Sequence, residues 1–313
     1  MLAKVSSLPQ QIRLRAVGNV VGGFLGFAGI VFIALRLTQP SLRLQLTISG
    51  SDVAMRAAPA VLGVLGAGLM MALAWRCILA HLQTQVSRKS AFSIYGLSQI
   101  SKYVPGNVFQ FLGRQALGAA KGIPDAALAK SCLWELGTVF TAGAVFVPLI
   151  LPLCTIRIAP VIAAAIFATL LVGCFCVIRR LLGQAIASAF LWHEAALATL
   201  GSVFAACTVF LLPPAIHCDA VMLVTLIAAY VAAWMAGLVT PGAPAGLGVR
   251  ETVLLLLLQK LLPESRLLPA ILVTRLVNVA GDCLFYLIPA VATLKRWPQD
   301  RRQATSLGSP GAE

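Results

Sequence analysis

Residues 102–114 read Lys-Tyr-Val-Pro-Gly-Asn-Val-Phe-Gln-Phe-Leu-Gly-Arg, a polar stretch that lies between long apolar segments. A related pattern recurs later in the chain, where Pro241-Gly242 precedes Arg250. In both copies the arginine follows its proline by nine residues (114 − 105 and 250 − 241). The motif therefore occurs once in each half of the chain, at an offset of 136 residues (241 − 105).

The composition is typical of an integral membrane protein. Of the 313 residues, 59% are hydrophobic and 11% are charged, whereas a soluble domain has about 25% charged residues. The formal net charge of +14 comes from basic residues that stand singly or in pairs between apolar runs. This distribution favours topogenic charge and attraction to anionic lipid headgroups, and it argues against a nucleic-acid partner.

The chain shows no enzyme signature. No G-x-S-x-G, Walker or Rossmann pattern stands in a suitable context, and no histidine cluster has the spacing of metal ligands. His193-Glu194 precedes an apolar run and is interpreted as an interfacial pair. We therefore expect a protein that is not an enzyme, with no catalytic residue, no metal and no cofactor.

Apolar runs of about 20 residues are long enough to cross a membrane as helices. They predict an all-α polytopic protein with one membrane domain over residues 1–313. The six predicted full spans lie near residues 17–35, 58–79, 126–151, 158–178, 197–216 and 268–292.

Two further regions fit a full span less well. Residues 84–123 carry too many polar groups to face lipid, and residues 220–239 run into a Pro-Gly break followed by about three apolar turns to Leu262. Each is interpreted as a helix, a break and a second short helix that enters and leaves the membrane on the same side. The alternative is that both regions cross fully, which gives eight spans.

The 136-residue offset also superposes the flanking spans approximately, which indicates pseudo-repeats over residues 10–152 and 153–298. With three crossings in each half, the repeats are inverted. Lys4, Arg13 and Arg15 place the N-terminus in the cytoplasm, and Lys295 and Arg296 place the C-terminus there as well. Residues 299–313 are predicted to form a disordered cytoplasmic tail.

Broken helices at membrane depth need partners for their freed backbone groups, so they are candidate sites that line a polar cavity. We expect the half-helices after Pro105-Gly106 and Pro241-Gly242 to bring two arginines to a shared cavity, with these four residues as hinges. A guanidinium fork suits a phosphate. The candidate substrate-binding residues are Arg114, Arg250, Lys102, Asn107, Gln110 and Glu251. In the alternative interpretation, Pro-Gly only turns the chain, and Arg250 pairs with Glu251 or extends to the membrane interface.

Other polar residues inside the apolar runs need partners, because an unpaired charge in the membrane is costly. Arg275, Asn278 and Asp282 share one helical face by their spacing, and Glu135 marks the equivalent span of the first half. We expect Glu135 or Asp282 to pair with one of the arginines. A proton-coupling role for these carboxylates is the less favoured alternative.

The two motifs resemble the membrane domain of the lysylphosphatidylglycerol synthase/flippase family, also called flippase-like integral membrane proteins. The resemblance rests on Lys102-Tyr-Val-Pro-Gly-Asn-Val108 with Gly113-Arg114, and on Pro241-Gly242 with Gly246-Leu-Gly-Val-Arg-Glu251. It implies the translocation half of such proteins, without the soluble aminoacyl-transfer domain, in a bacterial cytoplasmic (inner) membrane. The second motif departs from the family pattern Pro-Gly-Gly-Leu-Gly-x-Arg-Glu. It contains the insertion-like Ala243-Pro-Ala245, which stiffens the second turn.

These observations predict a lipid flippase that moves an anionic or aminoacylated phospholipid, or a lipid-linked headgroup, between leaflets through a central cavity. Its partner is then a membrane phospholipid. The alternative is a non-transporting membrane scaffold or regulatory subunit for an envelope glycosyltransferase or lipid synthase. A membrane-embedded transferase is a third, less favoured hypothesis.

Overall fold

The computed structural model describes residues 50–103, 109–153, 158–213, 216, 218–240 and 243–307. All regular secondary structure in these residues is helical. In chain order the elements are α2 (Gly50–His81), α3 (Arg88–Gln99), η3 (Ile100–Tyr103), α4 (Phe109–Ala119), α5 (Asp125–Val145), η4 (Val147–Leu153), α6 (Pro160–Leu182), α7 (Gln184–Leu211), α8 (Ala220–Val239), η5 (Pro244–Gly246), α9 (Val249–Leu258) and α10 (Glu264–Leu307). The prediction of an all-helical protein is confirmed for this part of the chain.

Five described segments are long and apolar enough to cross a membrane, namely Ala57–His81 of α2, the helices α6, α7 and α8, and Glu264–Thr293 of α10. A sixth results if α5 and η4, which meet at a bend of 40°, form one span. The chain is therefore a multi-pass membrane protein. Five of the six predicted spans fall on these segments, and the predicted span at 17–35 lies outside the described residues.

Helix α7 is the centre of the packing, and it differs from its prediction. It begins at Gln184 instead of near residue 197, and it contacts α2, α5, α6, α8 and α10. A Cβ at Gly201 would lie 2.7 Å from a side-chain carbon of Ile227, so α7 and α8 approach closely. Its first half carries two buried polar residues, His193 and Glu194, and it stays helical inside the bundle because a helix pairs its own backbone groups.

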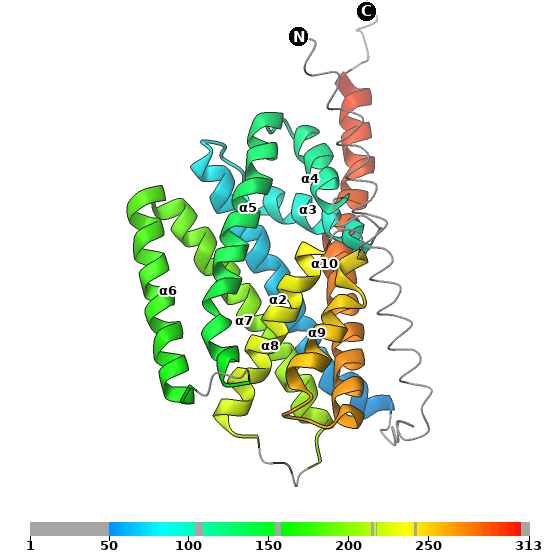
Figure 1. Ribbon diagram of the computed structural model, residues 1–313. Coiled ribbons are helices and arrows are strands. Elements are labelled where there is room, and N and C mark those ends of the chain that lie inside the picture. Colours follow the sequence, from blue (N-terminus) through cyan, green and yellow to red (C-terminus); the bar gives the residue numbers. More distant parts are fainter. Residues whose placement is uncertain are drawn as a thin grey trace, which may run out of the picture.

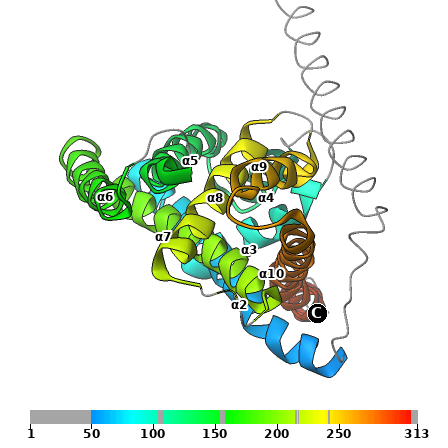
Figure 2. The same ribbon diagram turned by 60° about the horizontal axis from the view of Figure 1, so that its bottom comes forward.

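Helix α6 lies at the outer edge of the bundle (Figure 2). Of its 23 residues only Ala163 is buried. Its high mean hydropathy and exposed apolar side chains are those of a helix that faces lipid on most sides.

The two predicted broken segments are both present as two helices around a break. In the first hairpin, α3 and η3 lead toward the middle of the molecule, and α4 returns to the end where α3 began (Figure 1). Helices α8 and α9 form the second hairpin, which opens toward the opposite end. The tips η3 and η5 contact each other, and α9 packs back against α8. Pro105, Gly106, Asn107, Pro241 and Gly242 lie outside the described residues.

The C-terminal end of α10 is longer than the sequence indicated. The helix continues to Leu307, whereas a disordered tail was predicted from residue 299. Residues 300–304 read Asp-Arg-Arg-Gln-Ala, and most of them have good helix propensity. Extending an existing helix avoids the cost of nucleation. Residues 308–313 lie outside the described part.

Candidate functional site

The hairpin of α3 and α4 is held in place by close contacts with α2 and α10. Its N-terminus is capped by Ser87, whose hydroxyl accepts a hydrogen bond from the Ser90 amide at 3.1 Å. Tyr95 packs in a tilted arrangement against Trp75, with ring centroids 6.3 Å apart. A Cβ at Gly96 would lie 2.7 Å from the Phe285 carbonyl oxygen, so only glycine lets α3 approach α10 this closely.

Two adjoining cavities lie between the hairpins and the surrounding helices. The first has an empty volume of about 610 Å³ and the second of about 450 Å³, part of which is open to the outside. They share the lining residues Met71, Gln99, Lys102, Trp234, Ala245 and Arg250. The first is also lined by Tyr95, Gln110, Phe111, Arg114, Glu135 and His193 among others, and the second by Tyr103, Arg275, Asn278 and Asp282 among others.

Arg114 and Arg250 thus line one cavity, as the sequence predicted. They come from α4 and α9, one in each hairpin. Their surroundings nevertheless differ, and this difference determines what each can do.

The positive charge of Arg114 is neutralised by a carboxylate. It is 2% exposed and forms an ion pair with Glu135 of α5. The Tyr95 hydroxyl donates to the other oxygen of the same carboxylate at 2.8 Å, and the guanidinium carbon lies 3.9 Å from the centroid of the Tyr95 ring. The predicted pairing of Glu135 with one of the arginines is confirmed. With its charge already paired, Arg114 forms a fixed wall of the cavity.

Arg250 lies in a narrow slot made by residues of the second hairpin. A Cβ at Gly237 would lie 2.8 Å from the Arg250 Cγ, and a Cβ at Gly246 would lie 2.7 Å from the Nε. The guanidinium carbon is 5.3 Å from the centroid of the Trp234 indole. Among the described residues, the Arg250 Nε has no hydrogen-bond partner. The slot thus fixes the side chain without supplying a counterion.

The alternative pairing of Arg250 with Glu251 is wrong. Glu251 lies 3.7 Å from the Nε of Arg275 instead, and it lines neither cavity. Because adjacent residues of a helix point about 100° apart, Arg250 faces the cavities while Glu251 faces α10. Its expected role in direct substrate binding is therefore not supported by its position.

Asp282, the other carboxylate named as a possible partner for an arginine, contacts a lysine and a tyrosine instead. Its Oδ2 lies 2.7 Å from the Lys102 Nζ and accepts a hydrogen bond from the Tyr103 hydroxyl at 2.6 Å. These contacts join the tip of the first hairpin to α10. The pairing depends on how deeply η3 extends into the bundle, and the hydropathy of the sequence does not determine that depth.

The predicted shared face of Arg275, Asn278 and Asp282 is confirmed, since all three line the second cavity. The Asn278 amide donates to the Tyr230 hydroxyl at 2.7 Å, and the Arg275 guanidinium donates to the Ala245 carbonyl at 3.1 Å. Through these bonds α10 holds α8 and the tip η5 of the second hairpin.

The third turn of α7 contains a pair that the sequence misplaced. His193 and Glu194 are 1% and 7% exposed, so they are buried in the bundle and not at its interface. His193 lines the first cavity, and its Nδ1 has no hydrogen-bond partner among the described residues. Both Glu194 oxygens likewise have none. A sequence prediction that began α7 at Gln184 would have placed this pair inside the helix and not before it.

The charges at the two cavities do not balance. The cations are Lys102, Arg114, Arg250 and Arg275, and the carboxylates that pair with them are Glu135, Glu251 and Asp282. Counting four cations against three carboxylates leaves one positive charge, and in the described structure Arg250 is the cation without a carboxylate within salt-bridge distance. An anion is the ligand that such a site accommodates. Within the same residues, no group of three or more His, Cys, Asp or Glu is placed to hold a metal ion.

A comparison of the chain with models of known protein families finds no match, and a comparison with curated protein sequences finds none either.

Proposed function

We propose that this protein is a lipid translocator that binds the anionic headgroup of a phospholipid or lipid-linked molecule in the central cavity and moves it between leaflets without a nucleotide. The single observation that carries the proposal is that Arg250 lines both cavities and has no carboxylate partner among the described residues. A lipid phosphate supplies the missing negative charge. The planar guanidinium suits its geometry through two parallel N–H donors.

The arrangement of charges also supports reversible binding. Arg114, Lys102 and Arg275 are each paired with a carboxylate, so an incoming headgroup meets one free cation. A single charge-assisted contact stabilises the bound headgroup by about 1.5–3 kcal/mol. Such a site can hold a headgroup and still release it, as a carrier requires.

In this mechanism the two halves of the chain form an inverted repeat. Shifting α2, α3, α4 and α5 by the 136-residue offset brings them onto or beside α7, α8, α9 and α10. The polar bonds follow the same plan, because Tyr95 of α3 donates to Glu135 of α5 and Tyr230 of α8 accepts from Asn278 of α10. The hairpins open toward opposite ends of the molecule (Figure 1). In the proposed cycle, each hairpin gives the headgroup access from one leaflet.

The proposal places the protein in a bacterial cytoplasmic membrane as a member of the flippase-like family that its motifs resemble. The lipid is anionic or aminoacylated, and the lipid tails stay in the surrounding bilayer while the headgroup passes the cavities. Because polar groups inside the membrane are covered by the bundle, the cavities offer the headgroup a path that avoids the hydrocarbon core.

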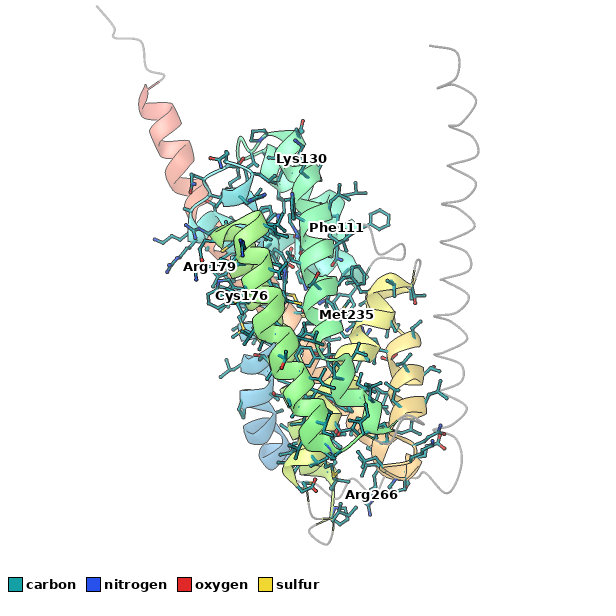
Figure 3. The ribbon with its side chains drawn as sticks, turned by 60° about the vertical axis from the view of Figure 1, so that its left-hand side comes forward. Phe111, Lys130, Cys176, Arg179, Met235 and Arg266 are labelled. Atoms are coloured by element: carbon teal, nitrogen blue, oxygen red, sulfur yellow. The ribbon has the colours of Figure 1, made fainter. Side chains whose placement is uncertain are left out.

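Reconstitution into liposomes tests the proposal. Wild-type protein is expected to accelerate the exchange of fluorescent phosphatidylglycerol between leaflets, measured by the fraction that a membrane-impermeant reductant quenches. Arg250→Gln should lower the rate by about 10- to 100-fold, because it removes the unpaired charge. Arg266→Gln is the matched control, since Arg266 lies exposed at an end of the bundle (Figure 3) and its loss should leave the rate unchanged.

The second candidate function is a membrane scaffold for an envelope glycosyltransferase or lipid synthase. It is favoured by α6, whose apolar surface is almost entirely exposed and is available to another membrane helix. If wild-type protein moves neither anionic nor aminoacylated lipid faster than an Arg114→Ala/Arg250→Ala variant does, the scaffold is favoured and transport is rejected.

A further inference from the structure

His193 is a buried polar side chain that the site as described so far does not use. It is 1% exposed on α7, at the first cavity, and its Nδ1 has no hydrogen-bond partner among the described residues. Leaving a buried polar atom unpaired costs about 1–3 kcal/mol. Unpaired groups of this kind are rare in folded proteins and call for an explanation.

The polar neighbours that line the same cavity do not provide the partner. The carboxylate of Glu135 is occupied by Arg114 and by the Tyr95 hydroxyl. Arg250 and Lys102 carry only donors, so they cannot accept a hydrogen bond from the imidazole. The cavity thus presents cationic or imidazole donors from four separate elements, namely η3, α4, α7 and α9, and the one carboxylate in its lining is already engaged.

We propose that His193 binds the phosphate of the translocated headgroup together with Arg250, and that Arg114 stays paired with Glu135 as a fixed wall beside them. This inference rests on the proposed function and assigns the binding contact that α7 contributes. An imidazole N–H donates to an anionic oxygen whether the ring is neutral or charged. A phosphate has enough oxygens to accept from both side chains at once.

Because His193 lies on α7, its contact with the phosphate connects two different parts of the bundle. Arg250 belongs to the second hairpin, whereas His193 belongs to the most central helix of the bundle. A phosphate held by both side chains therefore connects a hairpin to the helix around which the two halves pack. The same ligand chemistry is found in a lipid headgroup and in a soluble phosphate ester, and the experiment separates the two.

The test uses full-length protein in nanodiscs of phosphatidylcholine, with ¹⁵N-labelled histidine. In a His81→Gln/His217→Gln background, His193 gives the only histidine signal. Adding phosphatidylglycerol to the nanodiscs should shift this signal, and the shift should disappear in Arg250→Gln. Soluble glycerol phosphate is the second probe: a shift with both probes shows that the phosphate suffices, and a shift with phosphatidylglycerol alone shows that the lipid is required.

Affinity provides the second measurement. His193→Ala should weaken binding of fluorescent phosphatidylglycerol by about 10- to 100-fold, the range for a hydrogen bond to a charged partner. His193→Gln retains an N–H donor and should restore most of the affinity, which a merely structural role would not explain. His81→Gln is the matched control, because His81 contacts Trp134 at the end of α2 and does not line the cavity.

The outcomes separate the two proposals. If the wild type binds phosphatidylglycerol through Arg250, but the His193 signal does not shift and His193→Ala binds normally, the inference is overturned and the proposed function stands. If the wild type binds neither probe and Arg250→Gln behaves identically, the proposed function fails together with the inference.

Discussion

Two arginines, each on the second helix of its hairpin, have different electrostatic surroundings. Arg114 contacts a carboxylate and the faces of aromatic rings, whereas Arg250 contacts glycines and one indole. The chemistry of a guanidinium is the same in both cases. The difference is whether the following span provides a carboxylate opposite it, as α5 does for Arg114.

The Arg114–Glu135 pair gives a prediction for stability. Glu135→Gln leaves the Arg114 charge without a counterion in a side chain that is 2% exposed, and breaking such a buried pair costs about 3–5 kcal/mol. Arg114→Met added to Glu135→Gln removes the stranded charge, while Gln still accepts from Tyr95. We expect the single variant to unfold at a lower temperature and the double variant to recover most of the loss.

Thermal unfolding in detergent, followed by tryptophan fluorescence, measures both variants. A double variant as unstable as Glu135→Gln alone would show that the pair contributes through more than charge compensation.

At the scale of single elements, the second hairpin depends on a close approach between α8 and η5. Gly237 and Gly246 both face Arg250, and Gly246 has a φ of +69°, in the left-handed region that favours glycine. Ala245 beside it has a φ of 49°, and its carbonyl accepts from Arg275. The turn that the sequence marked by its extra Ala243-Pro-Ala245 is thus tied to α10.

Substituting these glycines tests the slot. Gly237→Ala adds a Cβ that would lie 2.8 Å from Arg250, so the guanidinium must move. We expect Gly237→Ala to lower phosphatidylglycerol binding to an extent comparable with Arg250→Gln. The helix content measured by circular dichroism should change little. Gly137→Ala in α5 is the control, because nothing lies within 4 Å of the added Cβ. Equal effects of the two substitutions would contradict the role of the slot.

At the scale of the whole molecule, basic residues gather at one end of the bundle. Lys130 and Arg179 lie toward the end where α10 finishes, and Arg266 lies at the other end (Figure 3). The first end is also where α3 begins with Arg88-Lys89. Since Lys and Arg accumulate on the cytoplasmic side, this end is expected to face the cytoplasm, in agreement with the orientation predicted from the sequence.

Cysteine labelling tests that orientation. In a variant without the eight native cysteines, Lys130→Cys and Arg179→Cys should react with an impermeant maleimide only in inside-out vesicles. Arg266→Cys should react only in right-side-out vesicles, because in the predicted topology an odd number of crossings separates it from Lys130. Labelling of all three from one side would reject the arrangement of α5 to α10 relative to the membrane.

The sequence by itself determined the properties that depend on local chemistry. Apolar length indicates which segments are long enough to cross the membrane, and a Pro-Gly pair inside an apolar run favours a break in the helix. The two broken segments and the arrival of Arg114 and Arg250 at one cavity were therefore predictable, as was the polar face of Arg275, Asn278 and Asp282.

Only the tertiary structure decided which charges meet. Asp282 pairs with Lys102, which is distant in the chain, Glu251 turns to Arg275 and leaves Arg250 unpaired, and His193 proves to be buried at the cavity. The physical reason is that these helices are apolar on nearly every side, so hydropathy does not specify how each is rotated about its axis. Rotation and depth are set by close contacts such as those at Gly96, Gly201 and Gly237, which form only when the helices pack together.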